Sequence, residues 1–217
     1  MSGIFSPESR FMRYMNRLAD LMILNLLFLL TSLPLFTIGA SLTAMYTVCF
    51  RLGTDREGGT FRDYFAAFRE NFGQATKLWL VAVAWGLATA VCTLLFYTMT
   101  GWVHYLFVPV GVLFAMVVLI FGYVFPLQSR FENNGITTLK NAVLLSLGYL
   151  PRSILMGALN VFPFVLLCTD LMTFLKASFA WVIIWFAAAA YVNTRILKKV
   201  FAPYLKKEDD DSTQDEA

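Results

Sequence analysis

Few side chains in this sequence have the types and the spacing that catalysis or metal binding requires. Cys49, Cys92 and Cys168 lie far apart and lack the C-x-x-C spacing of metal and redox sites. His104 is the only histidine, so a histidine zinc site and a Ser-His-Asp triad would both lack partners. No glycine-rich phosphate-binding motif occurs. We therefore expect no enzymatic activity, no metal, no cofactor and no nucleic acid partner.

A denser group of polar residues lies in an apolar stretch around Pro34 and Gly39. Proline removes a helical hydrogen-bond donor, so a helix is expected to break there. In lipid the freed backbone groups must be satisfied by protein, and short hydroxyl side chains can do this. Broken helices can also line substrate sites. Both interpretations of this structural or binding motif stay open, and its candidate residues are Asn25, Ser32, Pro34, Thr37, Gly39 and Ser41.

The composition places these residues in a membrane. Hydrophobic residues make up 59% of the 217 residues and charged residues only 14%, whereas charged residues make up about 25% of a soluble domain. A soluble domain of this size cannot bury so much apolar surface. We therefore expect an all-α, polytopic helical membrane protein with the lipid bilayer as its surroundings.

Runs without charged residues predict where the chain crosses the bilayer. They cover residues 21–50, 78–129, 153–169 and 177–194. A spanning helix needs about 20 residues, so the run 78–129 holds two segments, with a turn expected at residues 100–105. The first run is too long for one upright helix, and a break at Pro34 and Gly39 would divide it.

The lysine and arginine residues predict how the chain is threaded. Sixteen of the 17 fall into four groups, at residues 10–17, 51–77, 130–152 and 195–207, and the exception is Lys176 in a short hairpin loop. If all four groups face the cytoplasm, as the positive-inside rule favours, the chain forms three hairpins with six membrane segments and both termini in the cytoplasm. The alternative is five segments, in which the first run is one broken span and the N-terminus lies outside.

Two amphipathic helices are predicted on the cytoplasmic surface. In the first, residues 60–76, aromatic side chains recur at helical spacing on one face. That face either lies among lipid headgroups or packs on the ends of the spans, and it is also a candidate partner-binding surface. The second helix covers Thr138–Leu150. The aromatic face of the first helix consists of Phe61, Tyr64, Phe65, Phe68 and Phe72.

The domain organisation is expected to be simple. Residues 1–207 form a single helical membrane domain, and residues 208–217 form a disordered acidic tail. Each amphipathic helix follows one membrane segment and leads into the next. This order suggests an internal duplication, and the alternative is a chance similarity of two membrane-surface helices.

The first predicted hairpin and the helix after it also carry a resemblance to a known family. The residues concerned are Asn25-Leu26-Leu27-Phe28-Leu29-Leu30-Thr31-Ser32-Leu33-Pro34, Thr37-Ile38-Gly39-Ala40-Ser41, Asp55-Arg56-Glu57-Gly58 and Phe61-Arg62-Asp63-Tyr64-Phe65. They resemble the YesL-like family of bacterial membrane proteins (domain of unknown function 624), specifically over residues 16–80 and more loosely to residue 204.

The resemblance implies a plasma-membrane protein of Gram-positive-type bacteria. Genes of this family often lie beside genes for carbohydrate ABC transporters and polysaccharide degradation. This implies an accessory role in carbohydrate uptake or polysaccharide utilisation, with a carbohydrate ABC transporter complex as partner. The family defines no catalytic residue that could be carried over. A small transporter or channel, with the broken first hairpin as its site, is the alternative function.

Overall fold

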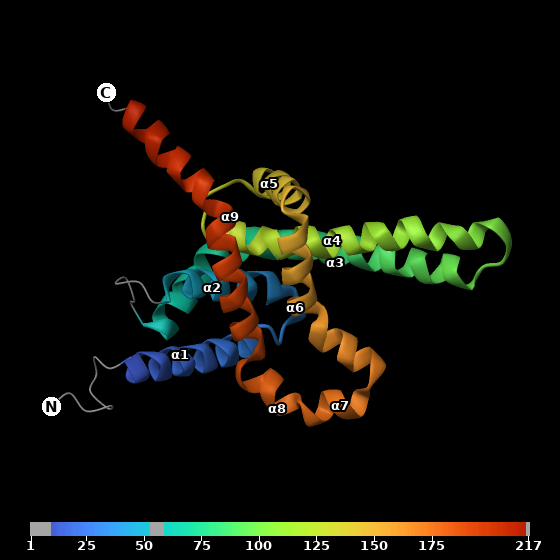
Figure 1. Cartoon of the computed structure of the whole chain (residues 1–217), viewed down its shortest axis with the longest axis horizontal. Helices are drawn as coiled ribbons and strands as arrows, with labels where there is room; N and C mark the ends of the chain where they lie inside the picture. Colours follow the sequence, from blue (N-terminus) through green and yellow to red (C-terminus); the bar gives the residue numbers. More distant parts are fainter. Residues whose placement is uncertain (1–9, 53–58, 216–217) are drawn as a thin grey trace.

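The computed structural model describes the backbone of residues 10–52 and 59–215 and the side chains of residues 11–52 and 59–204. Within these ranges the chain is helical and contains no strand, which confirms the all-α prediction (Figure 1). Five helical stretches are long and apolar enough to cross a membrane: Phe11–Thr31, Thr60–Thr98, Gly101–Gln128, Leu150–Thr169 and Ser178–Tyr204.

The first apolar run is broken where the sequence predicts it. Helix α1 (Arg10–Thr31) ends just before Pro34, whose backbone is extended, with φ −77° and ψ 99°. A short 3-10 turn, η1 (Leu35–Thr37), then leads into helix α2 (Ile38–Arg51). The apolar stretch Leu35–Arg51 is shorter than the five long ones. Five of the six expected segments therefore have the length of a spanning helix, and α2 does not.

Helix α2 lies in the centre of the fold. It packs against α1, α3, α4 and α9, and nearly every residue from Gly39 to Phe50 is buried. In contrast, the tip of the α1–α2 hairpin exposes the apolar side chains of Leu33, Leu35 and Phe36. An exposed apolar turn suits hydrocarbon rather than water, which is consistent with a hairpin tip inside the bilayer.

The predicted surface helix at residues 60–76 is not a separate element. It forms the first turns of α3 (Thr60–Thr98), a single helix of 39 residues that continues into the next span. The expectation of two separate surface helices is therefore wrong for the first one. The physical reason is that no proline lies between Thr60 and Thr98, and the isolated glycines there cost a helix only about 1 kcal/mol each.

Helices α3 and α4 (Phe107–Gln128) form a long hairpin, as expected for the run 78–129. They are joined by η2 (Gly101–Leu106), where Gly101 adopts a φ of +79° that favours glycine. Figure 1 shows this hairpin extending well beyond the other helices. Far fewer residues are buried in its spans than in the span of α9.

The second amphipathic helix is present as α5 (Gly135–Gly148), which ends two residues earlier than predicted. After it, α6 (Leu150–Thr169) and α9 (Phe186–Asp215) form the last predicted hairpin. Helices α7 (Leu171–Lys176) and α8 (Ser178–Ala180) and the π-helix η3 (Trp181–Trp185) connect them.

Asp170 begins helix α7 as its N-cap. Its carboxylate accepts hydrogen bonds from the backbone N–H groups of Met172 and Thr173, at 3.0 and 3.3 Å, and from the Thr173 hydroxyl. These bonds, chiefly that from the Thr173 hydroxyl, lower the pKa of Asp170. The carboxylate therefore stays charged at the turn of the last hairpin.

The backbone of α9 stays helical through Asp215, within the segment predicted to be a disordered tail. Pro203 is the last proline and no glycine follows it, so no helix-breaking residue ends the helix earlier. The side chains of residues 205–217 lie outside the described residues. The domain boundary at residue 207 and the internal duplication stay predictions.

Gly39 provides a direct test of the packing between α2 and α3. A Cβ atom at this position would lie 2.5 Å from the Ala75 carbonyl oxygen and 2.6 Å from Trp79 Cβ, so the two helices could not keep their separation. We expect Gly39→Ala to destabilise the protein by about 1–3 kcal/mol, the range for overpacking. Thermal melts of the purified protein in one detergent measure this.

Gly86→Ala and Gly122→Ala are matched controls, because nothing lies within 4 Å of the Cβ atom they add. Alanine is the better helix former by about 1 kcal/mol, so both controls should melt at or above the parent temperature. Pro34→Ala should be milder than Gly39→Ala, since the break is also held by hydrogen bonds. If Gly39→Ala melts with its controls, the close approach of α2 and α3 does not limit stability.

Candidate functional site

The candidate site at the broken hairpin contains a cluster of hydroxyl groups centred on Thr31, the last residue of α1. The Thr31 hydroxyl lies 2.6 Å from the hydroxyl of Tyr64 in α3 and 2.9 Å from that of Ser41 in α2. It also donates to the Leu27 carbonyl at 2.9 Å. Because a hydroxyl has one proton and two lone pairs, Thr31 can donate to Leu27 and accept from both neighbours. The cluster thus ties three helices together.

The carbonyl groups freed by the break also have partners. Thr37 Oγ1 lies within hydrogen-bond distance of the carbonyls of Thr31 and Pro34, the latter at 2.6 Å. Trp79 of α3 donates its indole N–H to the Leu35 carbonyl at 2.8 Å. These contacts favour the structural interpretation of the motif, because groups bonded to one another are not free to bind a substrate.

Ser32 differs from the other hydroxyl residues of the motif. Its Oγ is buried and has no hydrogen-bond partner among the described residues, so the expectation that Ser32 satisfies a local backbone group is wrong. Pro34 and Gly39 take part through their backbones: Pro34 ends the helical path, and Gly39 admits α3.

Asn25 lies away from the break and is completely buried. Its amide nitrogen donates to the carbonyls of Trp181 and Val182, at 3.1 and 2.6 Å, and its amide oxygen accepts from the backbone N–H of Ala187 at 3.0 Å. All three partners lie in or directly after the π-helix η3. A π-helical turn shifts the backbone hydrogen bonds away from the regular i→i−4 pattern. The Asn25 side chain forms hydrogen bonds with backbone groups in this irregular region.

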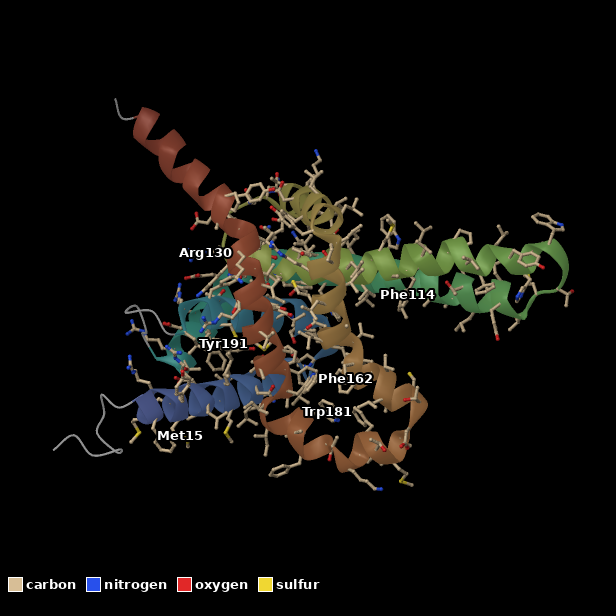
Figure 2. All side chains as sticks on the ribbon, in the orientation of Figure 1. Met15, Phe114, Arg130, Phe162, Trp181 and Tyr191 are labelled. Atoms are coloured by element: carbon tan, nitrogen blue, oxygen red, sulfur yellow. The ribbon has the colours of Figure 1, made fainter. Side chains whose placement is uncertain are left out.

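This contact joins the first and last membrane helices. Figure 2 shows Trp181 close to the end of α1, where the bottom of α9 meets it. The sequence gives no signal for the π-helix, because neither proline nor glycine occurs near Trp181–Trp185. Asn25 therefore belongs to a helix–helix contact rather than to the cluster at Pro34 and Gly39.

Packing against other helices buries part of the aromatic face of residues 61–72. Tyr64 is fully buried, and Phe65 and Phe68 are half-buried against the core. The rings of Tyr64 and Phe68 are stacked with centroids 6.4 Å apart. Phe61 and Phe72, at the two ends of the face, are exposed. The centre of the face therefore packs on the other helices, and only its ends remain available to lipid or to a partner.

A second polar contact combines residues that the sequence shows only as separate polar positions in apolar runs. Asn193 of α9 is fully buried, and its amide nitrogen lies 3.2 Å from the Tyr46 hydroxyl and 3.0 Å from Asn160 Oδ1. These residues come from α2, α6 and α9. Interhelical hydrogen bonds of this kind hold membrane helices together.

These features define the class of protein. An all-helical chain with five long apolar helices, whose internal polar groups bond mainly to each other and to backbone, is a polytopic integral membrane protein. Residues 21–97 match the sequence profile of a family described as "Protein of unknown function, DUF624". The match confirms the resemblance found in the sequence and covers the second half of α1, the break, α2 and nearly all of α3. Comparisons with curated proteins and with solved structures find no match.

The Asn25 contact predicts a specific loss of stability. In Asn25→Leu, two carbonyl groups and one N–H group near η3 lose their side-chain partner, and each unsatisfied buried polar group costs about 1–3 kcal/mol. We expect a clear fall in the melting temperature in detergent. Thr89→Val is the control, because the Thr89 hydroxyl bonds only carbonyls of its own helix. Equal melting of both variants would show that the contact contributes little.

Proposed function

We propose that this protein is a non-enzymatic accessory component of carbohydrate uptake in the plasma membrane, which acts by contact with a carbohydrate ABC transporter complex. The α3–α4 hairpin carries this proposal. It projects from the rest of the described protein (Figure 1) and exposes large apolar side chains on both helices, among them Trp85, Leu87, Leu94, Val112 and Leu113. Such a surface suits packing against lipid and against another membrane protein.

Carbohydrate uptake as the process rests on the family resemblance and on the genes that neighbour members of that family. The lack of a catalytic set supports a non-enzymatic role. His104, for example, lies in the η2 turn among the rings of Tyr97 and Phe107, and its Nδ1 is 3.1 Å from the Tyr97 carbonyl. No acid, base or nucleophile of the catalytic types is paired with it in the described contacts.

A transporter or channel in its own right is the second candidate. Coupled transporters usually carry ionisable residues near the middle of the membrane, and the runs 21–50 and 78–129 contain no Asp, Glu, Lys or Arg. Apart from the Ser32 hydroxyl, the polar side chains of the motif at the broken hairpin are also hydrogen-bonded within the protein. Both observations favour the accessory role.

The course of the chain bears on whether its two ends lie on the same side of the membrane, and the positive-inside rule then favours the cytoplasm for that side. In Figure 1 the first turns of α1 and the last turns of α9 lie on the same side of the protein, away from the tip of the α3–α4 hairpin. A chain that crosses or enters the membrane in an even number of segments has both ends on the same side of the membrane. The chain therefore favours six segments, with α2 as the short one.

Thiol labelling tests this topology in cells. With Cys49, Cys92 and Cys168 replaced by alanine, an impermeant thiol reagent should label Thr100→Cys in intact cells. Glu70→Cys and Asn134→Cys, both at exposed positions, should react only after the membrane is permeabilised. Thr100 is exposed beside the η2 turn and avoids the positive φ of Gly101. Labelling of Ser9→Cys in intact cells would establish the five-segment arrangement.

Photo-crosslinking tests the proposed partner. A photoreactive amino acid at Leu87 or Val112 should join the protein to a subunit of the transporter in cells grown on the relevant polysaccharide. Leu26 and Leu155 are matched controls, since they are similarly exposed but lie on α1 and α6. A crosslink that is absent from all four positions, or equally strong at all four, would contradict the proposal.

Reconstitution separates the two candidate functions. In liposomes that contain only this protein, an accessory component should move no oligosaccharide, whereas a transporter or channel should. Uptake above that of protein-free liposomes would favour the second candidate.

A further inference from the structure

A basic pocket lies between the first and last membrane helices, apart from the broken hairpin. It has a cavity volume of about 810 Å³ and opens between α1 and α9. Its cationic side chains are Arg17, Arg195, Lys198 and Lys199. Figure 2 labels Tyr191, which lies on α9 beside this pocket.

None of the residues that line the pocket is acidic. Asp20 is close in sequence to Arg17, but it accepts a hydrogen bond from Thr60 at 2.7 Å and lines a different pocket. Arg195 is held over the ring of Tyr191, with its guanidinium carbon 5.0 Å from the ring centroid, and it also donates to the Tyr191 hydroxyl. Four cations that share a pocket repel one another, so a bound anion would be favoured.

The pocket lies where both helices change from apolar to basic sequence. The charge-free run of α1 begins at Leu21, and that of α9 ends at Thr194. The lining includes the apolar side chains of Leu18 and Leu21 next to the cations. Tyr14 and Tyr191 supply aromatic rings of the type that is enriched at membrane interfaces. Cationic groups beside apolar ones, at the boundary of the bilayer, match a phosphate group that carries acyl chains.

We propose that this pocket binds the headgroup phosphate of an anionic phospholipid. The phosphate would lie among the arginine and lysine side chains, because guanidinium groups bond phosphate oxygens in a bidentate manner and ammonium groups add point charges. The acyl chains would follow the exposed apolar side chains of Met22 and Leu26 on α1, which continue from Leu18 toward the membrane interior. The bound lipid would then connect the first and last helices of the fold on their basic side.

Native mass spectrometry of the full chain tests this inference. The protein is purified in a neutral detergent and titrated with phosphatidylglycerol or, separately, with phosphatidylcholine. We expect one phosphatidylglycerol to be retained at low lipid concentration and phosphatidylcholine to be retained poorly. Arg17→Gln combined with Arg195→Gln should weaken phosphatidylglycerol binding roughly 30-fold, given the attraction of each basic residue to an anionic lipid.

The control is Arg62→Gln combined with Arg69→Gln. It also removes two positive charges, but from α3 and outside the pocket. It should retain phosphatidylglycerol like the parent, and melting in the lipid-free detergent shows whether both double variants are folded. If both lose the lipid equally, the binding is only a general attraction of charge and the proposal is wrong. If inorganic phosphate displaces the lipid at comparable concentration, the ligand is free phosphate and not a lipid headgroup.

Discussion

The fold depends on one constraint: a backbone that breaks inside a bilayer must find its hydrogen bonds within the protein. The chain breaks between Thr31 and Thr37, and the groups that satisfy it come from three helices. The Thr37 hydroxyl bonds the Pro34 carbonyl, and the Trp79 indole of α3 donates to the Leu35 carbonyl. The Tyr64 hydroxyl, also of α3, bonds the Thr31 hydroxyl. Because α3 supplies two of these side chains, it must lie close to the break and therefore to the start of α2, which follows the break directly. Glycine at position 39 makes that distance attainable.

The same principle explains how distant parts of the chain are joined. Asn25 forms hydrogen bonds with backbone groups at the π-helix, and Asn193 forms them with the side chains of Tyr46 and Asn160. In each case an amide side chain, which can both donate and accept, bridges helices far apart in sequence. In lipid, no hydrophobic effect drives apolar side chains of different helices together. Polar contacts of this kind, with close packing, therefore determine which helices are neighbours. The short helix α2 is surrounded as a result.

The sequence predicted those features that depend on local residue types. Pro34 and the hydroxyl residues near it indicated the break, and the charge-free runs indicated the hairpins. The sequence did not show that residues 60–76 continue into the following span, because the face of Tyr64 and Phe68 is amphipathic in either arrangement. Nor did it show the pairing of Asn25 with η3 or the basic pocket, since both arise only when α1 and α9 come together.

The continuity of α3 has a mechanical consequence. An unbroken helix tilts as one body, so a change at one end is transmitted to the other. Trp79, beside the contact with Gly39, lies about 29 Å from the end of α3 at Thr98, taking 1.5 Å per residue. A tilt of about 10° at that contact would therefore displace the far end of the hairpin by roughly 5 Å. By this geometry, a small change of tilt where α3 contacts α2 would correspond to a several-fold larger displacement at the tip of the α3–α4 hairpin.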